Sequence, residues 1–514
     1  MKIQIYDTTL RDGTQREGIS LSCDDKISIA LKLDELGVDF IEGGWPGSNP
    51  KDVEFFQRAR ELPLKHAVIT AFGATCRVSG TPADDQNIKA LLESKATVCT
   101  VVGKASIVHI EEVLRTTQEE NARIIEESVA YLRNQGRRVM FDAEHFFDGY
   151  RLDPECALGM LKAAERGGAE VLILCDTNGG TMPWEIGRMV REVRQQVSTL
   201  LGAHIHNDSE CAVAGSLEAV RAGCSQVQGT INGYGERCGN ANLISIIGDL
   251  SLKLGEETVP RDHLQNLTEL SHFVAEVANL SPDDHLPFVG RSAFAHKGGI
   301  HVAALRRSAD SYQHIDPETV GNRSRIVVSE LSGRGNLLSK AEEYGIDSAA
   351  AIGDILNEIK FLESQGFSFE AAEASVAIMM KRQQPGYVPP FELIDLTVNV
   401  EHRKGRGIFA EATVKVMVQG EVLHTAAEGT GPVHALDAAL RKALIPKYPA
   451  LANFRLADYK VRILNGDQGT GAITRVLIDT HNGAQHWSTV GASANIIEAS
   501  WRALADSMEY GLTL

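Results

Sequence analysis

Short β-rich segments alternate with segments of helical periodicity along the first half of the chain. Between the β-rich segments, apolar positions recur every three or four residues, as in residues 25–33, which is typical of amphipathic helices. Eight such units in about 250 residues match the count and length of a (β/α)8 barrel, or TIM barrel. The predicted strands are residues 2–9, 40–44, 66–72, 97–103, 139–146, 171–178, 201–208 and 226–233.

An open, doubly wound sheet is the alternative fold with the same alternation. Such sheets usually have fewer strands and begin with a glycine-rich first turn. The first turn here, residues 10–15, reads LRDGTQ and lacks the G-x-G-x-x-G pattern. We therefore expect an α/β protein built on a barrel, with its functional groups at the carboxyl ends of the strands.

The last third of the chain contains a pattern that occurs twice. One strand-like segment ends at Gly429 and is followed by a helical segment over residues 434–444. Another ends at Gly491 and is followed by a helical segment over residues 495–505. Gly429 and Gly491 lie 62 residues apart, which predicts a duplicated α+β unit with one helix per copy.

Three regions are expected along the chain. Residues 384–390, with the sequence QPGYVPP, form a proline-rich break that predicts a domain boundary. Residues 341–381 have the periodicity of helical connectors, for example in residues 352–359. We expect a barrel over residues 1–270, a lid and helical linker over residues 271–384, and an α+β domain over residues 391–514.

Composition and charge narrow the class of protein. Of the 514 residues, 43% are apolar and 23% charged, and no run approaches the ~18 apolar residues of a membrane span. The chain opens directly into a predicted strand without an apolar signal segment, so we expect a cytoplasmic protein. A net charge of -17 disfavours nucleic-acid binding. The eight cysteines include no C-x-x-C pair and are interpreted as reduced core thiols.

Polar residues follow several of the predicted strands, and in a barrel these strand ends meet on one face. The pair His204 and His206 lies on one strand, where alternate side chains point to the same side. Sixteen histidines would give about 0.5 such pairs by chance, so the pair alone is weak evidence for a metal. The strand-end candidates are Arg11, Asp12, Glu42, Glu144, His145, Asp176, Thr177, His204, His206, Asn232 and Asn240.

Two imidazoles and a carboxylate at one barrel face favour a divalent metal site. His204, His206 and Asp12, with an amide oxygen, suit a cation that acts as a Lewis acid. Nitrogen and oxygen ligands without a thiolate leave Mg2+, Mn2+ and Zn2+ all open. The alternative is a pair of buried histidines satisfied by hydrogen bonds.

Three segments together resemble the 2-isopropylmalate synthase family of DRE-TIM metallolyases: residues 7–15 (DTTLRDGTQ), 204–208 (HIHND) and 235–242 (GERCGNAN). Within that family the chain is most similar to the citramalate synthase branch, and the resemblance covers nearly the whole chain. The segments that carry this closer similarity are residues 43–52 (GGWPGSNPKD), 141–150 (FDAEHFFDGY) and 174–180 (LCDTNGG).

The resemblance implies roles for individual residues at the metal. Asp12, His204 and His206 would be the protein ligands of a divalent cation, Mg2+ or Mn2+ in the first place and Zn2+ as an alternative. Asn240 would lie at or near the metal, and Arg11 would hold the keto oxygen of the substrate.

The resemblance also implies residues for substrate binding and proton transfer. Thr177 would bind the carboxylate of the keto acid, with Gln15 as a second substrate-binding residue. Glu144 and His301 would form the acid/base pair beside the acetyl-CoA methyl group, and Tyr312 would be the lid tyrosine. From the residues alone, His301 is a histidine on a surface loop next to two glycines, and it belongs to a lid only if the family pattern holds.

Two positions depart from the family pattern. Ile205 stands between the two histidines where relatives usually carry threonine, and by alternation it should point away from the metal. Asp142 stands two residues before Glu144, where a small residue is usual. Its carboxylate would face the site beside Glu144 and change the shape and charge of the keto-acid pocket.

The implied reaction is a Claisen-type condensation of acetyl-CoA with pyruvate, followed by thioester hydrolysis to (R)-citramalate and CoA, in isoleucine biosynthesis. The C-terminal domain resembles the LeuA-type regulatory domain, which implies a homodimer with isoleucine as effector. Synthesis of 2-isopropylmalate or homocitrate is the alternative that differs only in the keto acid. A lyase or aldolase would use the same barrel to cleave a bond. A non-catalytic amino-acid sensor is the alternative of a different class, and the intact site residues count against it.

Overall fold

The computed structural model describes residues 2–308, 311–346, 352–405 and 407–514, and two compact units can be distinguished in it. The first comprises Met1–Phe294 and Ile315–Arg323; the second comprises Ala295–His314 and Ser324–Leu514. Within the described ranges, none of the helices has the length and apolar character that crossing a membrane requires.

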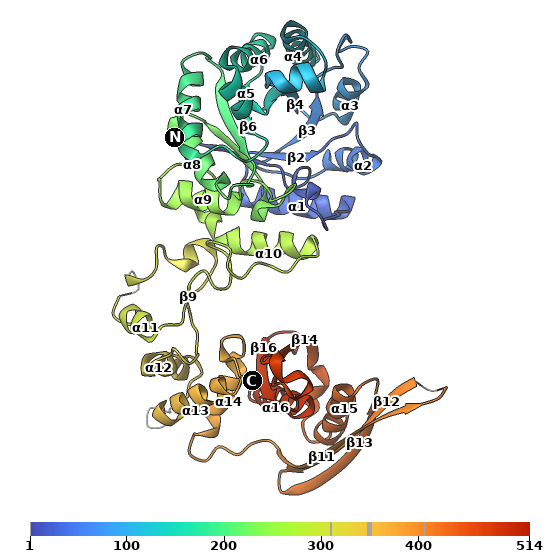
Figure 1. Ribbon diagram of the computed structural model, residues 1–514, viewed down its shortest axis with the longest axis vertical. Helices are drawn as coiled ribbons and strands as arrows, with labels where there is room; N and C mark the ends of the chain where they lie inside the picture. Colours follow the sequence, from blue (N-terminus) through green and yellow to red (C-terminus); the bar gives the residue numbers. More distant parts are fainter. Residues whose placement is uncertain (1, 309–310, 347–351, 406) are drawn as a thin grey trace. The chain divides into compact units, whose positions relative to one another are not determined.

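Eight parallel strands close into a barrel in the first unit (Figure 1). Strand β1 pairs with β2 on one side and with β8 on the other, which completes the ring. The predicted (β/α)8 barrel is therefore confirmed. Its strands are β1 (Gln4–Asp7), β2 (Phe40–Gly44), β3 (Val68–Ala74), β4 (Val98–Lys104), β5 (Arg138–Glu144), β6 (Val171–Asp176), β7 (Leu200–Ile205) and β8 (Gln226–Gly229).

Several strand ends differ from the predicted ones for local reasons. Strand β3 begins at Val68 and not at residue 66, because the buried Asp34 carboxylate accepts the backbone N–H groups of residues 65–67. Strand β8 stops at Gly229, and Asn232 beyond it has φ of 61°, which a strand does not allow. His206 lies just past β7 in an isolated bridge with Asn240.

Helices follow the strands and surround the barrel (Figure 1). Helix α1 (Cys23–Leu36) contains the predicted segment 25–33; it begins with a capping box between Ser22 and Asp25 and ends at Gly37, with φ of 94°. The other helices are α2 (Pro50–Ala59), α3 (Gln86–Ser94), α4 (Gln118–Asn134), α5 (Phe146–Leu152), α6 (Pro154–Gly167), α7 (Pro183–Arg194), α8 (Ala212–Ala222), α9 (Leu243–Leu252) and α10 (Leu267–Val277).

A polar network fills part of the barrel interior. The hydroxyl of the fully buried Tyr6 donates to Glu42 Oε2 at 3.0 Å. It also lies 2.8 Å from the Thr70 hydroxyl and 2.7 Å from the Thr100 hydroxyl. The Tyr6 hydroxyl, hydrogen-bonded to β3 and β4, thereby fixes the orientation of the Glu42 side chain in the middle of β2.

The first unit extends beyond the boundary predicted after residue 270. That position falls inside α10, and the unit continues to Phe294. Residues 315–323 also return to it: the Thr268 hydroxyl donates to Val320 O at 2.7 Å, and the Asn322 amide donates to Phe288 O at 3.0 Å. The chain segment between these two parts of the unit belongs to the second unit.

The second unit begins with the helical region and ends with the duplicated module. Helices α12 (Arg334–Glu343), α13 (Ile352–Ser364) and α14 (Glu373–Arg382) confirm the predicted helical connectors, apart from residues 347–351, which lie outside the described residues. After the proline-rich segment, two antiparallel sheets each carry one helix, as predicted. The first copy is β11 (Glu392–Arg403), β12 (Gly407–Val418), β13 (Glu421–Gly429) and α15 (Pro432–Leu444); the second is β14 (Arg455–Ile463), β15 (Thr474–His481), β16 (His486–Ser493) and α16 (Ile496–Gly511).

Gly429 and Gly491 occupy equivalent places in the two copies, where a strand passes close to its helix. A Cβ atom on Gly491 would lie 2.0 Å from Ala499 O, and one on Gly429 would lie 2.4 Å from Ala435 N. We expect Gly429→Ala to lower the free energy of unfolding by about 1–3 kcal/mol, because strand and helix must separate. Gly431→Ala, with no atom within 4 Å of the added Cβ, is the control. Equal urea-unfolding midpoints for the two variants would contradict this prediction.

Candidate active site

A cavity of about 480 Å³ opens at the carboxyl ends of the barrel strands. Among the residues predicted for the site, the structure brings seven to its wall: Arg11, Asp12, Gln15, Glu144, Thr177, His204 and His206. Six of these seven residues were strand-end candidates, and Gln15 came from the family resemblance.

Asp12, His204 and His206 form a compact cluster at this cavity. His204 Nε2 lies 3.3 Å from Asp12 Oδ2 and 3.3 Å from His206 Nε2. One ligand atom from each of the three residues falls within 4.8 Å of the others. All three side chains are buried, so a cation among them would be largely shielded from bulk water.

The charges within the cluster suit a cation. Burial alone would raise the pKa of Asp12, but Arg11 and the hydrogen bond with His204 outweigh it and hold that pKa well below its usual value. Burial, together with the neighbouring His204, lowers the pKa of His206 to about 4. Asp12 is thus ionised and His206 neutral, which are the forms that bind metals.

Unpartnered buried atoms support the same conclusion. Asp12 Oδ1, His206 Nδ1 and Asn240 Oδ1 are buried and have no hydrogen-bond partner among the described residues. Asn240 is paired with His206 through the backbone bridge, and its amide nitrogen donates to Tyr234 O at 3.3 Å. Because buried polar atoms are normally satisfied, the unpartnered oxygens of Asp12 and Asn240 fit a divalent cation beside the two imidazoles, whose Nε2 atoms face each other.

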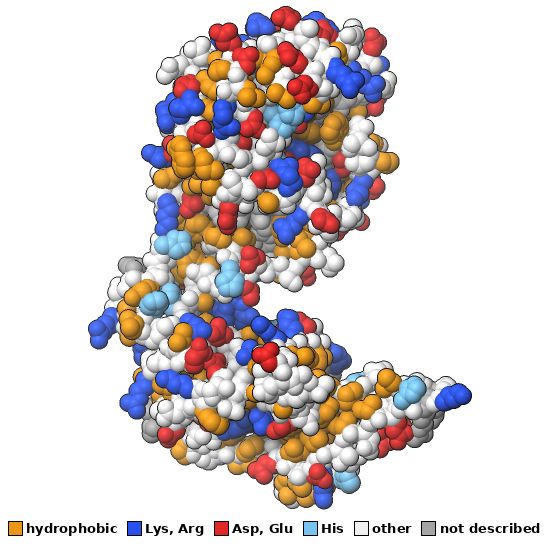
Figure 2. Space-filling model, in the orientation of Figure 1, with side chains coloured by type: hydrophobic (Ala, Val, Ile, Leu, Met, Phe, Trp, Pro, Cys, Tyr) orange, Lys and Arg blue, Asp and Glu red, His pale blue; other side chains and the backbone are white. Residues whose placement is uncertain are grey.

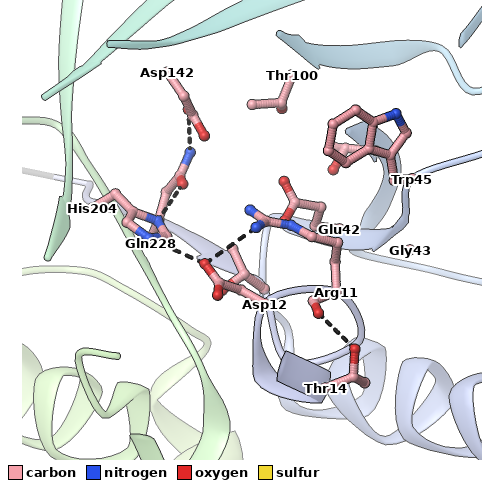
Figure 3. Close-up of polar contacts among 12 residues, drawn as sticks. Arg11, Asp12, Thr14, Glu42, Gly43, Trp45, Thr100, Asp142, His204 and Gln228 are labelled. Carbon is pink, nitrogen blue, oxygen red and sulfur yellow. Dashed lines mark hydrogen bonds and ion pairs between the residues drawn. The ribbon is translucent and has the colours of Figure 1, made fainter. Parts of the chain in front are cut away.

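Arg11 is held at the cavity by charges and by an aromatic ring. Its Nε donates to Glu42 Oε1 at 2.6 Å, and one terminal nitrogen lies 3.3 Å from Asp12 Oδ2 (Figure 3). The guanidinium carbon lies 3.8 Å from the centroid of the Phe72 ring. Burial would lower the pKa of Arg11, but Glu42 and Asp12 raise it above its usual value, so the group is a fixed positive charge.

Glu144, the last residue of β5, forms an ion pair that the sequence analysis missed. Lys104, the last residue of β4, contacts Glu144 Oε2 directly, and both line the cavity. Lys104 pairs with Glu144 in the register of the two strands. Lys104 directly follows the predicted strand over residues 97–103, so the strand-end rule could have found it.

Thr177, just after β6, has a hydroxyl free to donate. Its Oγ1 accepts the backbone N–H of His145 at 2.9 Å, and its backbone carbonyl accepts from Arg237 at 2.8 Å. Because the hydroxyl oxygen serves as an acceptor there, its hydrogen remains free for a ligand in the cavity.

The structure agrees with both expectations for the departures from the family pattern. Ile205 is 2% exposed and its Cδ1 points toward Gly215 of α8, away from the metal cluster. Asp142 lines the cavity near Glu144, with 3% of its surface exposed. Burial raises the pKa of Asp142 to about 7.

Asp176 and Asn232, two further strand-end candidates, serve the fold. Asp176 accepts two hydrogen bonds from Thr181, at 3.0 Å and 2.9 Å, and Asn232 exchanges hydrogen bonds with Ser271.

Gln228 of β8, in contrast, was missed by the sequence analysis and lies directly behind His204. The alternation along β8 was the signal that could have found it.

His145 gives the barrel unit a testable dependence on pH. It has φ of 58°, and its ring stacks on His109 at 3.7 Å between centroids. Burial, and then the neighbouring His109, lower its pKa from 6.5 to about 4. Between these pH values the unfolded chain binds a proton that the folded chain does not, so stability is lost as the pH falls through this window.

We therefore expect His145→Asn to flatten the acid side of the stability profile. Asparagine tolerates the positive φ and does not titrate. As the pH falls from 7 to 4.5, the free energy of unfolding of the variant should rise relative to that of wild type by on the order of 1–2 kcal/mol. Thermal unfolding at each pH measures this difference. His285→Asn, at an exposed position, is the control and should follow the wild-type slope. Parallel profiles for wild type and His145→Asn would contradict the prediction.

His301 and Tyr312 belong to the second unit and not to the barrel unit. His301 lies on helix α11 (Gly299–Leu305) and not on a loop. The two rings stack with centroids 4.2 Å apart and planes 25° apart, and both residues are exposed. The two residues thus form a pair, and their action on the barrel site stays a prediction.

Comparison with known proteins identifies the family. A family model described as HMGL-like matches residues 2–274, which is more than half of the chain. The chain belongs to the HMGL-like family. Two further models match this HMGL-like chain: a homocitrate synthase post-HMGL domain over residues 288–366, and the LeuA allosteric (dimerisation) domain over residues 370–512.

Curated relatives cover the HMGL-like chain from end to end. It is 52% identical to the (R)-citramalate synthase of Geobacter sulfurreducens, over 99% of this chain and 97% of that protein. The enzyme of the same name from Synechocystis is 52% identical over 99% and 96%, and that from Aquifex aeolicus is 49% identical over 99% and 98%. The family resemblance inferred from the sequence is confirmed.

Proposed function

We propose that this protein is an (R)-citramalate synthase, which condenses acetyl-CoA with pyruvate and hydrolyses the thioester to give (R)-citramalate and CoA. The observation that carries the proposal is the convergence of His204 Nε2, His206 Nε2 and Asp12 Oδ2 beside the fixed Arg11 guanidinium. The high identity to proteins of that name over the whole chain supports the choice of reaction.

Asp12, His204 and His206 would hold a divalent cation, with Asn240 beside them. The cation, when bound, polarises the keto carbonyl and stabilises negative charge that develops on its oxygen. The mixed nitrogen and oxygen ligands leave Mg2+, Mn2+ and Zn2+ open, and the family resemblance favours Mg2+ or Mn2+. The unpartnered Asp12 Oδ1 and Asn240 Oδ1 support this assignment.

Arg11 and Thr177 would orient pyruvate in the cavity. The Arg11 guanidinium would donate to the C2 carbonyl oxygen and then to the alkoxide that replaces it, where a fixed charge needs no reorganisation. The Thr177 hydroxyl would donate to the pyruvate carboxylate, since its oxygen already accepts from His145. Gln15, at the rim of the same cavity, would add a second polar contact.

Glu144 and His301 would remove a proton from the acetyl-CoA methyl group. The Glu144 carboxylate, which pairs with Lys104 at the cavity, would orient and support the histidine base. Tyr312, stacked on His301, would fix the plane of that ring. The resulting carbanion attacks C2 of pyruvate, a C–C bond forms, and water then cleaves the thioester to release CoA.

Thiol release with acetyl-CoA tests the reaction. Pyruvate is compared with 2-oxoisovalerate and 2-oxoglutarate, with a chelator and with His206→Ala as controls. Chelator-sensitive CoA release with pyruvate supports the proposal. A preference for 2-oxoisovalerate would move the assignment to 2-isopropylmalate synthase, and a preference for 2-oxoglutarate to homocitrate synthase. No release with any keto acid would refute the condensation.

The C-terminal module would mediate dimerisation and regulation by isoleucine. Its match to the LeuA domain supports this, and so does a group of exposed apolar side chains along β11 to β13 (Figure 2). These are Leu393, Ile394, Val400, Ile408 and Val422, which are 39–67% exposed. Light scattering should give twice the mass of the chain. Isoleucine, but not valine or leucine, should lower CoA release. A monomer unaffected by isoleucine would refute this part.

A further inference from the structure

A buried chain of hydrogen bonds joins three barrel strands behind the metal cluster (Figure 3). Gln228 of β8 donates from Nε2 to Asp142 Oδ1 of β5 at 3.2 Å. Its Oε1 lies 2.9 Å from His204 Nδ1 of β7. The three side chains are at most 5% exposed, and neither Asp142 nor Gln228 takes part in the proposed reaction steps.

The chemistry of these groups gives the chain of hydrogen bonds one direction. Above the raised pKa of about 7 Asp142 is ionised and only accepts hydrogen bonds, so it requires the NH2 group of Gln228 on its side. The amide oxygen of Gln228 then faces His204, and because that oxygen only accepts, Nδ1 of His204 must carry a hydrogen. The lone pair of a neutral His204 is therefore on Nε2.

Nε2 is also the nitrogen of His204 that faces the metal cluster. It lies 3.3 Å from Asp12 Oδ2 and 3.3 Å from His206 Nε2. Opposite the Asp12 carboxylate this position takes a positive charge: either a proton on Nε2 that donates to Asp12, or a divalent cation that replaces that proton. The hydrogen-bond chain thus keeps the hydrogen on Nδ1 and leaves Nε2 as the nitrogen that can meet a cation at this position.

We propose that Asp142 and Gln228 are positioning residues, which hold His204 in the tautomer that presents the Nε2 lone pair to a divalent cation. This inference rests on the metal site of the proposed function and adds two residues to it. Metal-bound histidines commonly donate a hydrogen bond from the N–H of their second ring nitrogen to such a partner, and losing the partner typically weakens metal binding about 10- to 100-fold.

Without the Asp142 acceptor, the hydrogen of a neutral His204 ring would no longer be held on Nδ1. The Gln228 amide would be free to turn by half a rotation and donate from its NH2 group to His204 Nδ1. The hydrogen of the neutral ring would then lie on Nε2, between the ring and the cation position, and a cation would have to displace it.

Four variants of the full-length chain separate this role from a general effect of packing. Asp142→Leu removes the acceptor at similar size, whereas Asp142→Asn keeps an oxygen that can accept from Gln228. Gln228→Met removes the amide between the two partners. Gln226→Met is the matched control: Gln226 lies two residues earlier on the same strand, is fully buried, and donates to Gln4 Oε1 at 3.1 Å.

The readout is the affinity of chelator-treated protein for Mn2+ at pH 8, with free Mn2+ counted by electron paramagnetic resonance. Asp142→Leu and Gln228→Met should bind Mn2+ about 10-fold or more weakly, and Asp142→Asn and Gln226→Met within about 3-fold of wild type. Melting temperatures of the metal-free proteins show whether each variant is folded. If Asp142→Leu does not fold, the pair Gln228→Met and Gln226→Met carries the test.

Three outcomes would overturn the proposal. Wild-type affinity in both Asp142→Leu and Gln228→Met would refute the positioning role and leave the metal site intact. An equal loss in Gln226→Met would assign the effect to packing. Failure of the wild-type protein to bind Mn2+ would refute the metal site of the proposed function, and this inference with it.

Discussion

Replacement of Asp12 by asparagine is expected to lower kcat/KM for CoA release by at least about 10³-fold. A Lewis acid supplies several kcal/mol of charge stabilisation, and each 1.36 kcal/mol corresponds to about tenfold in rate. Asparagine keeps the shape of the side chain but removes the negative charge that lies 3.3 Å from His204 Nε2. The cation then loses its anionic protein ligand.

Two controls make this result specific to the metal site. Chelator should reduce wild-type activity to the level of Asp12→Asn and have no further effect on the variant. Asp34→Asn removes another buried carboxylate, which accepts the backbone N–H groups of residues 65–67 just before β3. It should lower the melting temperature and leave kcat/KM within about 3-fold of wild type. Substantial chelator-sensitive activity in Asp12→Asn would contradict the assignment of Asp12 as a ligand.

Arg11→Met is expected to reduce both activity and stability. Loss of a fixed donor to the developing oxyanion should lower kcat by about 10²- to 10³-fold. The same change leaves the Glu42 carboxylate, with 0% of its side chain exposed, without its cationic partner. Breaking a buried ion pair in this way costs about 3–5 kcal/mol of unfolding free energy.

The double variant Arg11→Met/Glu42→Gln separates the two effects. Removing the charge of Glu42 eliminates the uncompensated carboxylate, so urea unfolding should show most of the lost stability restored. The amide can still accept from the Tyr6 hydroxyl, which donates to Glu42 in the wild-type protein. CoA release should stay at the level of the single variant. Recovery of activity together with stability would show that Arg11 acts only through the fold.

The sequence by itself determined the architecture, because both repeats in it are local patterns. Alternation of strand-like and helical segments predicted the eight barrel units. The strand-then-helix pattern around Gly429, which occurs again around Gly491, predicted the duplicated module. The strand-end rule then brought His204 and His206 to the same face as Asp12, although about two hundred residues separate them. Hydrophobic periodicity suffices for this level of detail, since it depends only on near neighbours in the chain.

Only the tertiary structure decided which side chains meet and where each strand stops. Lys104 contacts Glu144 and Gln228 contacts Asp142 across 40 and 86 residues of sequence, and nothing local specifies such pairs. The start of β3 depends on backbone N–H groups that donate to the Asp34 carboxylate, some thirty residues earlier. Hydrogen-bond partners and burial are set by the packed barrel, so the direction of the chain from Asp142 to His204 follows from the fold and not from any motif.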